Sequence, residues 1–247
     1  GDSTCFIPPQ NISQSILSEV EEWTKRIGIR LGIRGCFNIQ YAIRDEVLYV
    51  LEVNPRGSRT FPFVAKATGV PLARIAARLA LGEKLSDLEI PRPQTEAVCV
   101  KAPVFPFIKL RGLDPAPGPE MKSTGEVMGS HVRPAAAYLK ARLATELPVP
   151  TTGGVYITVK DEDKHDMIEL ARRLQDLGFR LHATRGTARV LREVGGIEVE
   201  TCYRIAERMS PDALDLMRKG MIQLVINTPR STGGAVLDGT MMRRLAV

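Results

Sequence analysis

The first sixty residues carry two different hydrophobic patterns. Apolar residues at positions 16, 17, 20, 23, 27 and 31 recur at steps of three and four, which predicts an amphipathic helix with Ser13 as a possible N-cap. We interpret Trp23 as a core anchor of this helix. Segments 36–44 and 47–54 instead alternate apolar and polar positions around a short polar connection, so we expect a β-hairpin.

Strand and helix patterns continue along the rest of the chain. We expect helices over 61–69 and 71–81, the second with Pro71 in its first turn, then a strand over 97–107 and a turn-rich segment over 112–118. In the last hundred residues the pattern predicts strands over 155–160, 179–183, 197–203 and 221–227, separated by helices over 163–177, 187–194 and 211–219. Such alternation is typical of a parallel sheet covered by helices.

A proline- and glycine-rich segment over 144–154 separates the two patterns, and we place a domain boundary there, between 1–147 and 148–247. The predicted fold class is therefore α/β and α+β: an antiparallel sheet with helices, followed by a parallel α/β domain. Ligands of parallel sheets bind at the carboxyl ends of the strands.

Composition narrows the classes of function. The chain has 247 residues, 44% hydrophobic and 25% charged, as in ordinary folded proteins, and no apolar run long enough to span a membrane. Its start resembles no secretory signal, which favours a cytoplasmic or organellar protein without membrane partners. The net charge of +6 is well mixed and aromatic residues make up only 5%, which favours small anionic ligands over nucleic acid.

Cysteine and histidine spacing argues against several kinds of site. The four cysteines lie too far apart for a C-x-x-C motif, so we expect reduced thiols. The three histidines show no metal-ligand spacing, which argues against zinc and against a histidine-dependent triad.

Three polar residues interrupt the apolar pattern of the hairpin: Gln40, Glu52 and Asn54. All three are even-numbered, whereas the apolar residues at 37, 39, 41, 43, 47, 49, 51 and 53 are odd-numbered. Because side chains alternate along a strand, any register with an even position sum puts the three on one side of the hairpin. If Arg44 pairs with Leu48, Gln40 lies directly opposite Glu52.

One carboxylate with two amide oxygens is a ligand set that Mg²⁺ or Mn²⁺ prefers, with phosphate oxygens and water completing the coordination. Arg56 and Arg59 follow in the next turn, where guanidinium groups could grip phosphate or a carboxylate-like substrate. This combination suggests phosphoryl transfer. The same residues are also what any half-exposed hairpin and solvated turn can show, so the residues alone leave both interpretations open.

A second candidate site follows the predicted strand over 179–183. Segment 182–188 joins strand to helix, and its Thr184 and Thr187 hydroxyls, with the amides of the helix start, would form an anion cradle. Lys164, Arg204 and Asn227 follow the neighbouring strands at the same edge of the sheet. The alternative is that the threonines only cap a helix and the basic residues are solvated.

Several motifs resemble a known family. Segments 38–40, 49–60 and 62–72 resemble the end of an ATP-grasp domain in the carbamoyl-phosphate synthase large chain, and segments 1–3 and 118–129 are similar to further parts of that chain. The resemblance implies the second ATP-grasp half, which phosphorylates carbamate with ATP, followed by a methylglyoxal-synthase-like regulatory domain. It implies a divalent-metal site for Mg²⁺ or Mn²⁺ formed by Gln40, Glu52 and Asn54, and a catalytic role for Arg56 and Arg59.

The resemblance also assigns the remaining candidates. Gly1, Asp2 and Ser3 would approach the nucleotide or neighbouring loops, together with Gln40 and Glu52. A nucleotide monophosphate effector, such as uridine or inosine monophosphate, would be bound by five residues: Lys164, Thr184, Thr187, Arg204 and Asn227. The expected partners are the glutaminase small subunit and a further copy of the chain in an oligomer formed through the regulatory domain.

Three departures from the family pattern bear on regulation. Arg204 stands where relatives often have lysine, and Pro229 replaces a hydroxyl that some relatives carry, so the identity of the effector stays open. Lys101 is followed by Ala102 instead of an acidic residue, which argues against activation by ornithine because the ligand's ammonium would lack a partner.

Two rival functions remain. One is a ligand-sensing module alone. The other is a methylglyoxal-synthase-type lyase. Segment 210–215 argues against the lyase, because it lacks the Gly-Gly-Asp-Gln-Gln sequence that carries the catalytic base of that enzyme. Because the upstream lobe of the ATP-grasp domain is missing from these residues, we expect no synthase activity from the chain by itself.

Overall fold

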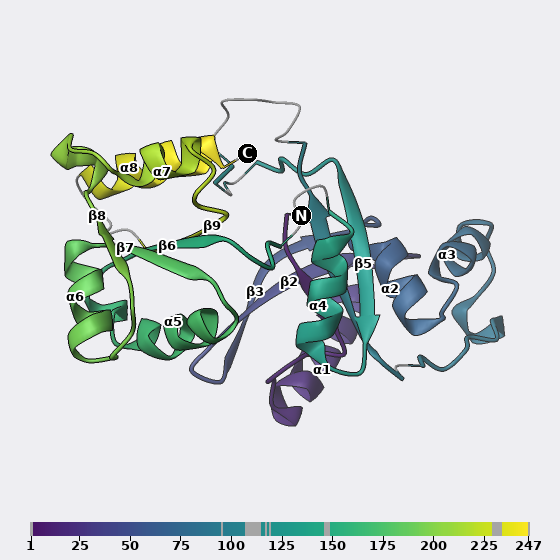
Figure 1. The fold of residues 1–247 in the computed structure, drawn as a ribbon. Helices are drawn as coiled ribbons and strands as arrows, with labels where there is room; N and C mark the ends of the chain where they lie inside the picture. The colour runs from purple at the N-terminus through teal and green to yellow at the C-terminus, as the bar shows by residue number, and fades with distance from the viewer. Residues whose placement is uncertain are drawn as a thin grey trace. The chain divides into compact units, whose positions relative to one another are not determined.

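A computed structural model describes residues 2–94, 96–106, 115–116, 118, 120–145, 149–228 and 234–246 (Figure 1). The chain forms two compact units: unit 1 comprises 1–105 and 121–148, and unit 2 comprises 106–120 and 149–247. The predicted boundary between 147 and 148 lies outside the described residues and stays a prediction, as does most of the turn-rich segment 112–118.

A helix and a hairpin form the first part of unit 1, as predicted. Helix α1 (Gln14–Arg30) contacts strand β3 (Val47–Asn54), which pairs antiparallel with β2 (Asn38–Arg44). The two turn residues, Asp45 and Glu46, both have positive φ (53° and 57°), the conformation of a two-residue turn that fits the twist of the strands. Ser13 is the N-cap residue, but its hydroxyl donates to the Glu46 carboxylate at 2.8 Å and so links the helix start to the hairpin turn.

The register of the hairpin corrects one prediction and preserves another. Arg44 pairs with Val47 and not with Leu48, and a bulge in β3 then restores the pairing of Gln40 with Glu52. The prediction that the odd-numbered positions form the apolar face is therefore wrong for the first half of β3, where even-numbered Leu48 is 3% exposed and odd-numbered Tyr49 is 49% exposed. Beyond the bulge the predicted faces hold.

A second layer of unit 1 is a three-stranded antiparallel sheet covered by a helix. Its strand order is β1-β4-β5, and α4 (Pro134–Leu143) packs on β4 and β5 around Val100, Ala102, Ala137 and Ala141. The helix approaches closely at Gly129, where an added Cβ would lie 2.3 Å from the Ala137 carbonyl oxygen. The sequence patterns predicted only the middle strand of this layer; its three strands are β1 (Cys5–Ile7), β4 (Val98–Val104) and β5 (Gly125–His131).

Two short helices and one 3₁₀ turn complete unit 1. Pro71 is the N-cap of the second helix and not part of its first turn, which corrects the prediction by one residue. The elements are α2 (Thr60–Thr68), α3 (Leu72–Ala80) and η1 (Leu85–Asp87).

Unit 2 is a four-stranded parallel sheet with helices on both faces, which confirms the predicted α/β class. The strand order is β8-β7-β6-β9, and every pairing is parallel. Figure 1 shows α5 and α6 on one side of the sheet and α7 and α8 on the other. The strands are β6 (Gly154–Val159), β7 (Arg180–Thr184), β8 (Glu200–Cys202) and β9 (Leu224–Thr228), and the helices are η2 (Asp161–Asp163), α5 (Asp166–Asp176), α6 (Arg185–Glu193), η3 (Ile205–Glu207), α7 (Ala213–Arg218) and α8 (Gly234–Leu245).

Two apolar clusters hold this sheet between its helices. One joins Val155, Ile157 and Ala183 to α5 and α6, and the other joins Tyr156 and Cys202 to α7 and α8. Because successive side chains of β6 enter different clusters, both faces of the strand are buried, as expected of a central parallel strand. Helix α8 was not predicted, and the predicted strand over 197–203 is reduced to the three residues of β8.

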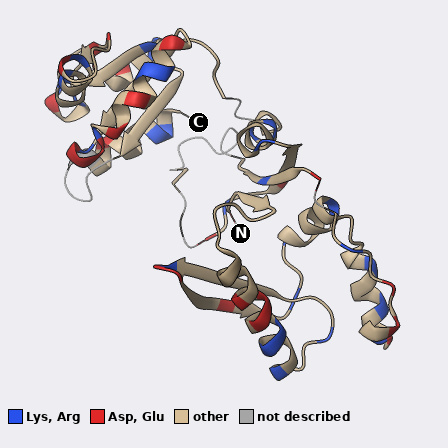
Figure 2. Ribbon diagram, turned by 90° about the horizontal axis from the view of Figure 1, so that it is seen from below, with Lys and Arg blue, Asp and Glu red and all other residues tan. Residues whose placement is uncertain are grey.

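Surface features agree with the composition. Figure 2 shows Lys and Arg positions interspersed with Asp and Glu positions along both units. All four cysteines are free thiols, as predicted. Among the described residues, no helix has the length and apolar character needed to cross a membrane.

Candidate functional site

The hairpin brings the three predicted ligand residues to one side. Gln40 and Glu52 are directly paired across the strands, and Asn54 follows Glu52 by two residues on the same side. The Asn54 amide donates from Nδ2 to Glu52 Oε1 at 2.9 Å, so these two side chains are in contact. Gln40 and Glu52 are both exposed and open to a ligand.

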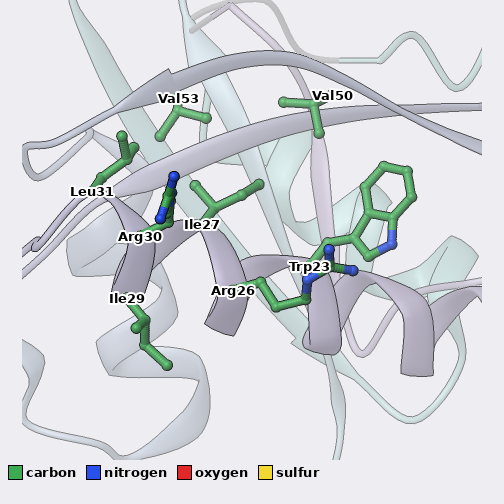
Figure 3. A pocket seen from close by; sticks show the side chains of 8 residues that line it. All are labelled: Trp23, Arg26, Ile27, Ile29, Arg30, Leu31, Val50 and Val53. Atoms are coloured by element: carbon green, nitrogen blue, oxygen red, sulfur yellow. The ribbon is translucent and has the colours of Figure 1, made fainter.

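The opposite side of the hairpin is apolar and faces α1. Figure 3 shows Val50 and Val53 pointing from the hairpin toward the helix, where they line a groove of about 880 Å³ with Trp23, Ile27 and Leu31. Trp23 therefore packs against the hairpin, but it is only partly buried, so its predicted role as a core anchor holds in part. The hairpin has one apolar and one polar face at its base, and the candidate metal ligands occupy the polar one.

The chemistry of this polar face fits a hard divalent cation. Glu52 supplies one carboxylate, Gln40 and Asn54 supply amide oxygens, and such oxygen donors are the ligands of Mg²⁺ and Mn²⁺. The described residues contain no group of three His, Cys, Asp or Glu side chains that could hold a metal. A cation here would therefore depend on the amides and on oxygens supplied by a ligand.

Arg59 is fixed by a buried serine beside the base of the hairpin. Its Nη1 donates to the Ser123 carbonyl oxygen at 2.8 Å and to the Ser123 hydroxyl at 2.9 Å. Ser123 is 5% exposed, whereas Arg59 itself is exposed. Among the hydrogen bonds of the described residues, Arg59 uses only this one nitrogen, so its other donors can reach an anion.

Asp2 is tied to the same serine. Its carboxylate accepts hydrogen bonds from the backbone amides of Lys122 and Ser123. Partial burial raises the pKa of the Asp2 carboxyl, but the hydrogen bonds from Ser123 and from the two amides outweigh burial and lower it. Asp2 thus anchors the segment on which Arg59 depends.

The other predicted residues of unit 1 are less constrained. Arg56 is exposed and donates to the Gly57 carbonyl oxygen at 3.2 Å, and the Ser3 hydroxyl lies 3.7 Å from Cys5 Sγ. Gly1 lies outside the described residues. Among the hydrogen bonds of the described residues, none joins Ser3 to Gln40, Glu52 or Asn54.

In unit 2 all five predicted effector residues line one pocket of about 270 Å³ at the carboxyl ends of the strands. Lys164 follows β6, Thr184 ends β7, and Arg204 follows β8. Asn227 lies in β9, and Thr187 lies in the first turn of α6. The pocket therefore lies where parallel sheets bind their ligands.

Polar and charged groups dominate this pocket. Thr184 is the N-cap residue of α6, and its hydroxyl lies 3.4 Å from that of Thr187, both side chains being buried. Lys164 Nζ lies 2.5 Å from Asp161 Oδ1. Gly186, the second residue of α6, leaves room for this ammonium, because an added Cβ would lie 2.9 Å from Lys164 Nζ. The arrangement combines a helix N-terminus, hydroxyls and cations, which together bind phosphate well.

Sequence reasoning missed three charged residues of the pocket: Lys160, Asp161 and Asp238. The first two could have been found, because Lys160 is the last residue of the predicted strand over 155–160, Asp161 directly follows it, and Lys164 comes after the same strand. Asp238 lies on α8, which the sequence patterns did not predict. Burial raises the pKa of the Asp238 carboxyl against the opposing effects of the Ala206 amide and Arg204.

Comparisons with known proteins match both units. Residues 1–88 match the family described as carbamoyl-phosphate synthase L chain, ATP binding domain, and residues 166–247 match the MGS-like domain. The carbamoyl phosphate synthase large chain of Methanoculleus marisnigri is 49% identical over 93% of this chain and 22% of its own length. That of Methanothermobacter thermautotrophicus is 46% identical over the whole chain and 23% of its own length.

A third relative is a separate C-terminal section of the large chain. This protein of Methanocaldococcus jannaschii is 43% identical over the whole chain and 41% of its own length. The chain thus spans less than a quarter of the two full-length relatives and about two fifths of the C-terminal section.

Proposed function

The chain belongs to the carbamoyl phosphate synthase large-chain family, and on that premise we propose that unit 1 contributes to ATP-dependent phosphorylation of carbamate and unit 2 binds a nucleotide monophosphate effector. The direct pairing of Gln40 with Glu52, with Asn54 in contact with Glu52, carries the proposal for unit 1. The presence of all five effector residues in one pocket carries the proposal for unit 2.

In unit 1 the polar face of the hairpin would hold Mg²⁺ or Mn²⁺ through Glu52, Gln40 and Asn54. Bound there, the cation would neutralise phosphate charge on ATP. Arg59 would hold the transferred phosphoryl group or carbamate, because Ser123 fixes its guanidinium and leaves other donors for an anion. Arg56, exposed in the same turn, would supply a second cation.

Manganese binding tests the hairpin site directly. We expect electron paramagnetic resonance of the 247-residue chain to detect bound Mn²⁺ in the presence of ATP, and Glu52→Gln to weaken that binding at least tenfold. Glu46→Gln is the matched control, because Glu46 lies at the opposite end of the hairpin and binds Ser13. Equal Mn²⁺ affinity in all three proteins would overturn the hairpin site.

The activity of the complete enzyme would need more than this chain. We propose that the full large chain works with a glutaminase small subunit and that carbamoyl phosphate formation requires parts of the relatives that this chain does not span. The 247 residues alone should therefore give no carbamoyl phosphate above background in an ATP turnover assay. Association of copies through unit 2 is a further proposal, which sedimentation can test.

Calorimetric titration with uridine and inosine monophosphates tests unit 2. We expect at least one of them to bind, and Thr184→Ala and Lys164→Ala to weaken binding. Failure of both nucleotides to bind would overturn the effector role. The same titration with ornithine should give no binding, because Ala102 is a fully buried alanine at the position where relatives activated by ornithine have an acidic residue.

A lyase function has less support in the geometry. Asp212 and Asp215 are the carboxylates of segment 210–215, where the lyase would carry its base. Each accepts a hydrogen bond from the backbone amide of the other at the start of α7. They act as a capping box for that helix, which leaves them poorly placed as a base.

A further inference from the structure

The effector pocket of unit 2 contains an internal anion beside its principal cation. Lys164 Nζ lies 2.5 Å from Asp161 Oδ1, and both residues line the pocket. The Lys164 side chain is only 14% exposed, whereas that of Asp161 is 57% exposed. The cation is thus held inside the pocket, and its counter-ion lies at the solvent side.

Lys164 also lies against the N-terminus of α6. An added Cβ on Gly186, the second residue of that helix, would be 2.9 Å from Lys164 Nζ. The N-terminus of a helix carries a partial positive charge, so a lysine ammonium there is unfavourable unless an anion is close. Without a ligand, the Asp161 carboxylate is the anion in contact with it.

A bound phosphate would need the same ammonium. It would satisfy both the helix N-terminus and Lys164, and it would either displace the Asp161 carboxylate or lie close to its negative charge. Displacement gives up the ion pair with Lys164, so competition for this ammonium lowers phosphate affinity. Repulsion alone would also lower affinity, but its effect would not depend on Lys164. We propose that Asp161 is a built-in competing anion that holds Lys164 ready in the ligand-free pocket and tunes the pocket's affinity for phosphate monoesters.

This inference rests on the proposed effector function of the same pocket. A neighbouring pair shows why Asp161 is special. Lys160 and Asp163 have the same spacing and lie 3.5 Å apart, but Asp163 does not line the pocket. Within this acidic segment, Asp161 is the residue that both lines the pocket and forms an ion pair with Lys164.

The test is calorimetric titration of the 247-residue chain with uridine monophosphate, inosine monophosphate and inorganic phosphate. Loss of a partly exposed ion pair corresponds to a change of about two- to fivefold in affinity. We therefore expect Asp161→Asn to tighten binding by about that factor. Glu162→Gln is the matched control, since Glu162 is adjacent, exposed and outside the pocket, and its replacement removes the same charge. It should leave affinity unchanged.

A double-mutant cycle separates competition for Lys164 from general repulsion. In a Lys164→Ala background, Asp161→Asn should give no gain. An equal gain in Glu162→Gln, or a gain that persists without Lys164, would overturn the inference. If the parent binds a ligand and Asp161→Asn binds it no more tightly, the role of Asp161 is overturned but the effector function stands. If neither the parent nor Asp161→Asn binds any of the three ligands, the effector function itself is overturned.

Discussion

Gly186→Ala should separate stability from ligand binding in unit 2. Gly186 lies in α6 and has no positive φ, so alanine fits the backbone there. Replacing glycine by alanine in a helix contributes about 0.5–1 kcal/mol of stability, and less near a helix end. The variant should thus unfold at the parent's temperature or slightly above it.

The same substitution should weaken binding of phosphate monoesters. The new Cβ would lie 2.9 Å from Lys164 Nζ, whereas ordinary contacts begin at 3.4 Å, so the ammonium must move by about 0.5 Å or more. A hydrogen bond to a charged group contributes about 1.5–3 kcal/mol, and losing roughly half of it corresponds to an affinity about four- to twelvefold weaker. The methyl group also narrows the approach to the amides of α6.

Thermal unfolding followed by circular dichroism and titration with uridine or inosine monophosphate measure the two effects separately. We expect unchanged or higher stability together with binding about four- to twelvefold weaker. If the variant binds with the affinity of the parent, the position of the Lys164 ammonium does not require the open space beside Gly186, and the prediction fails. If the loss is as large in a Lys164→Ala background, the methyl group acts on the ligand and not through the lysine, and the reasoning is refuted.

Two further predictions concern the scaffold. Gly129→Ala should destabilise the β1-β4-β5 layer by about 1–3 kcal/mol, because the added Cβ would collide with the α4 backbone. Gly125→Ala is the control and should have little effect, because the nearest neighbour of its Cβ lies at 4.0 Å. Hydrogen exchange of α4 peptides compares the two variants, and equal protection in both would contradict the close packing at Gly129. Burial lowers the pKa of the His182 imidazole below its usual value of about 6.5, because the folded protein disfavours the charged form. Unit 2 should therefore be most stable above that pH and lose stability as the pH falls below it. The measurement is the denaturant midpoint between pH 7.5 and 5.5, and a midpoint that rises on acidification would contradict this prediction.

The hairpin shows how far periodicity reaches. Alternation of polar and apolar residues found both strands and correctly put Gln40 opposite Glu52, but it assumed one register along the whole hairpin. The two-residue turn at Asp45 and Glu46 requires an odd position sum, and the bulge in β3 returns the sum to even. A bulge adds one residue to one strand without a marker in the apolar pattern. The pairing of Gln40 with Glu52 could be predicted because both residues lie beyond the bulge.

The pocket of unit 2 shows the opposite limit. Strict alternation of strands and helices fixed the carboxyl edge of the sheet, so Lys164, Thr184 and Arg204 could be brought together without coordinates. Asp161 was missed because a one-dimensional pattern shows which edge a residue follows but not which cation its carboxylate contacts. The charge sequence Lys160-Asp161-Glu162-Asp163-Lys164 is nearly balanced, and only the fold decides that Asp161, of the three carboxylates, forms the ion pair with Lys164, for which we propose phosphate binding. Affinity in such a pocket therefore depends on pairings within the ligand-free protein as much as on the cations that a motif identifies.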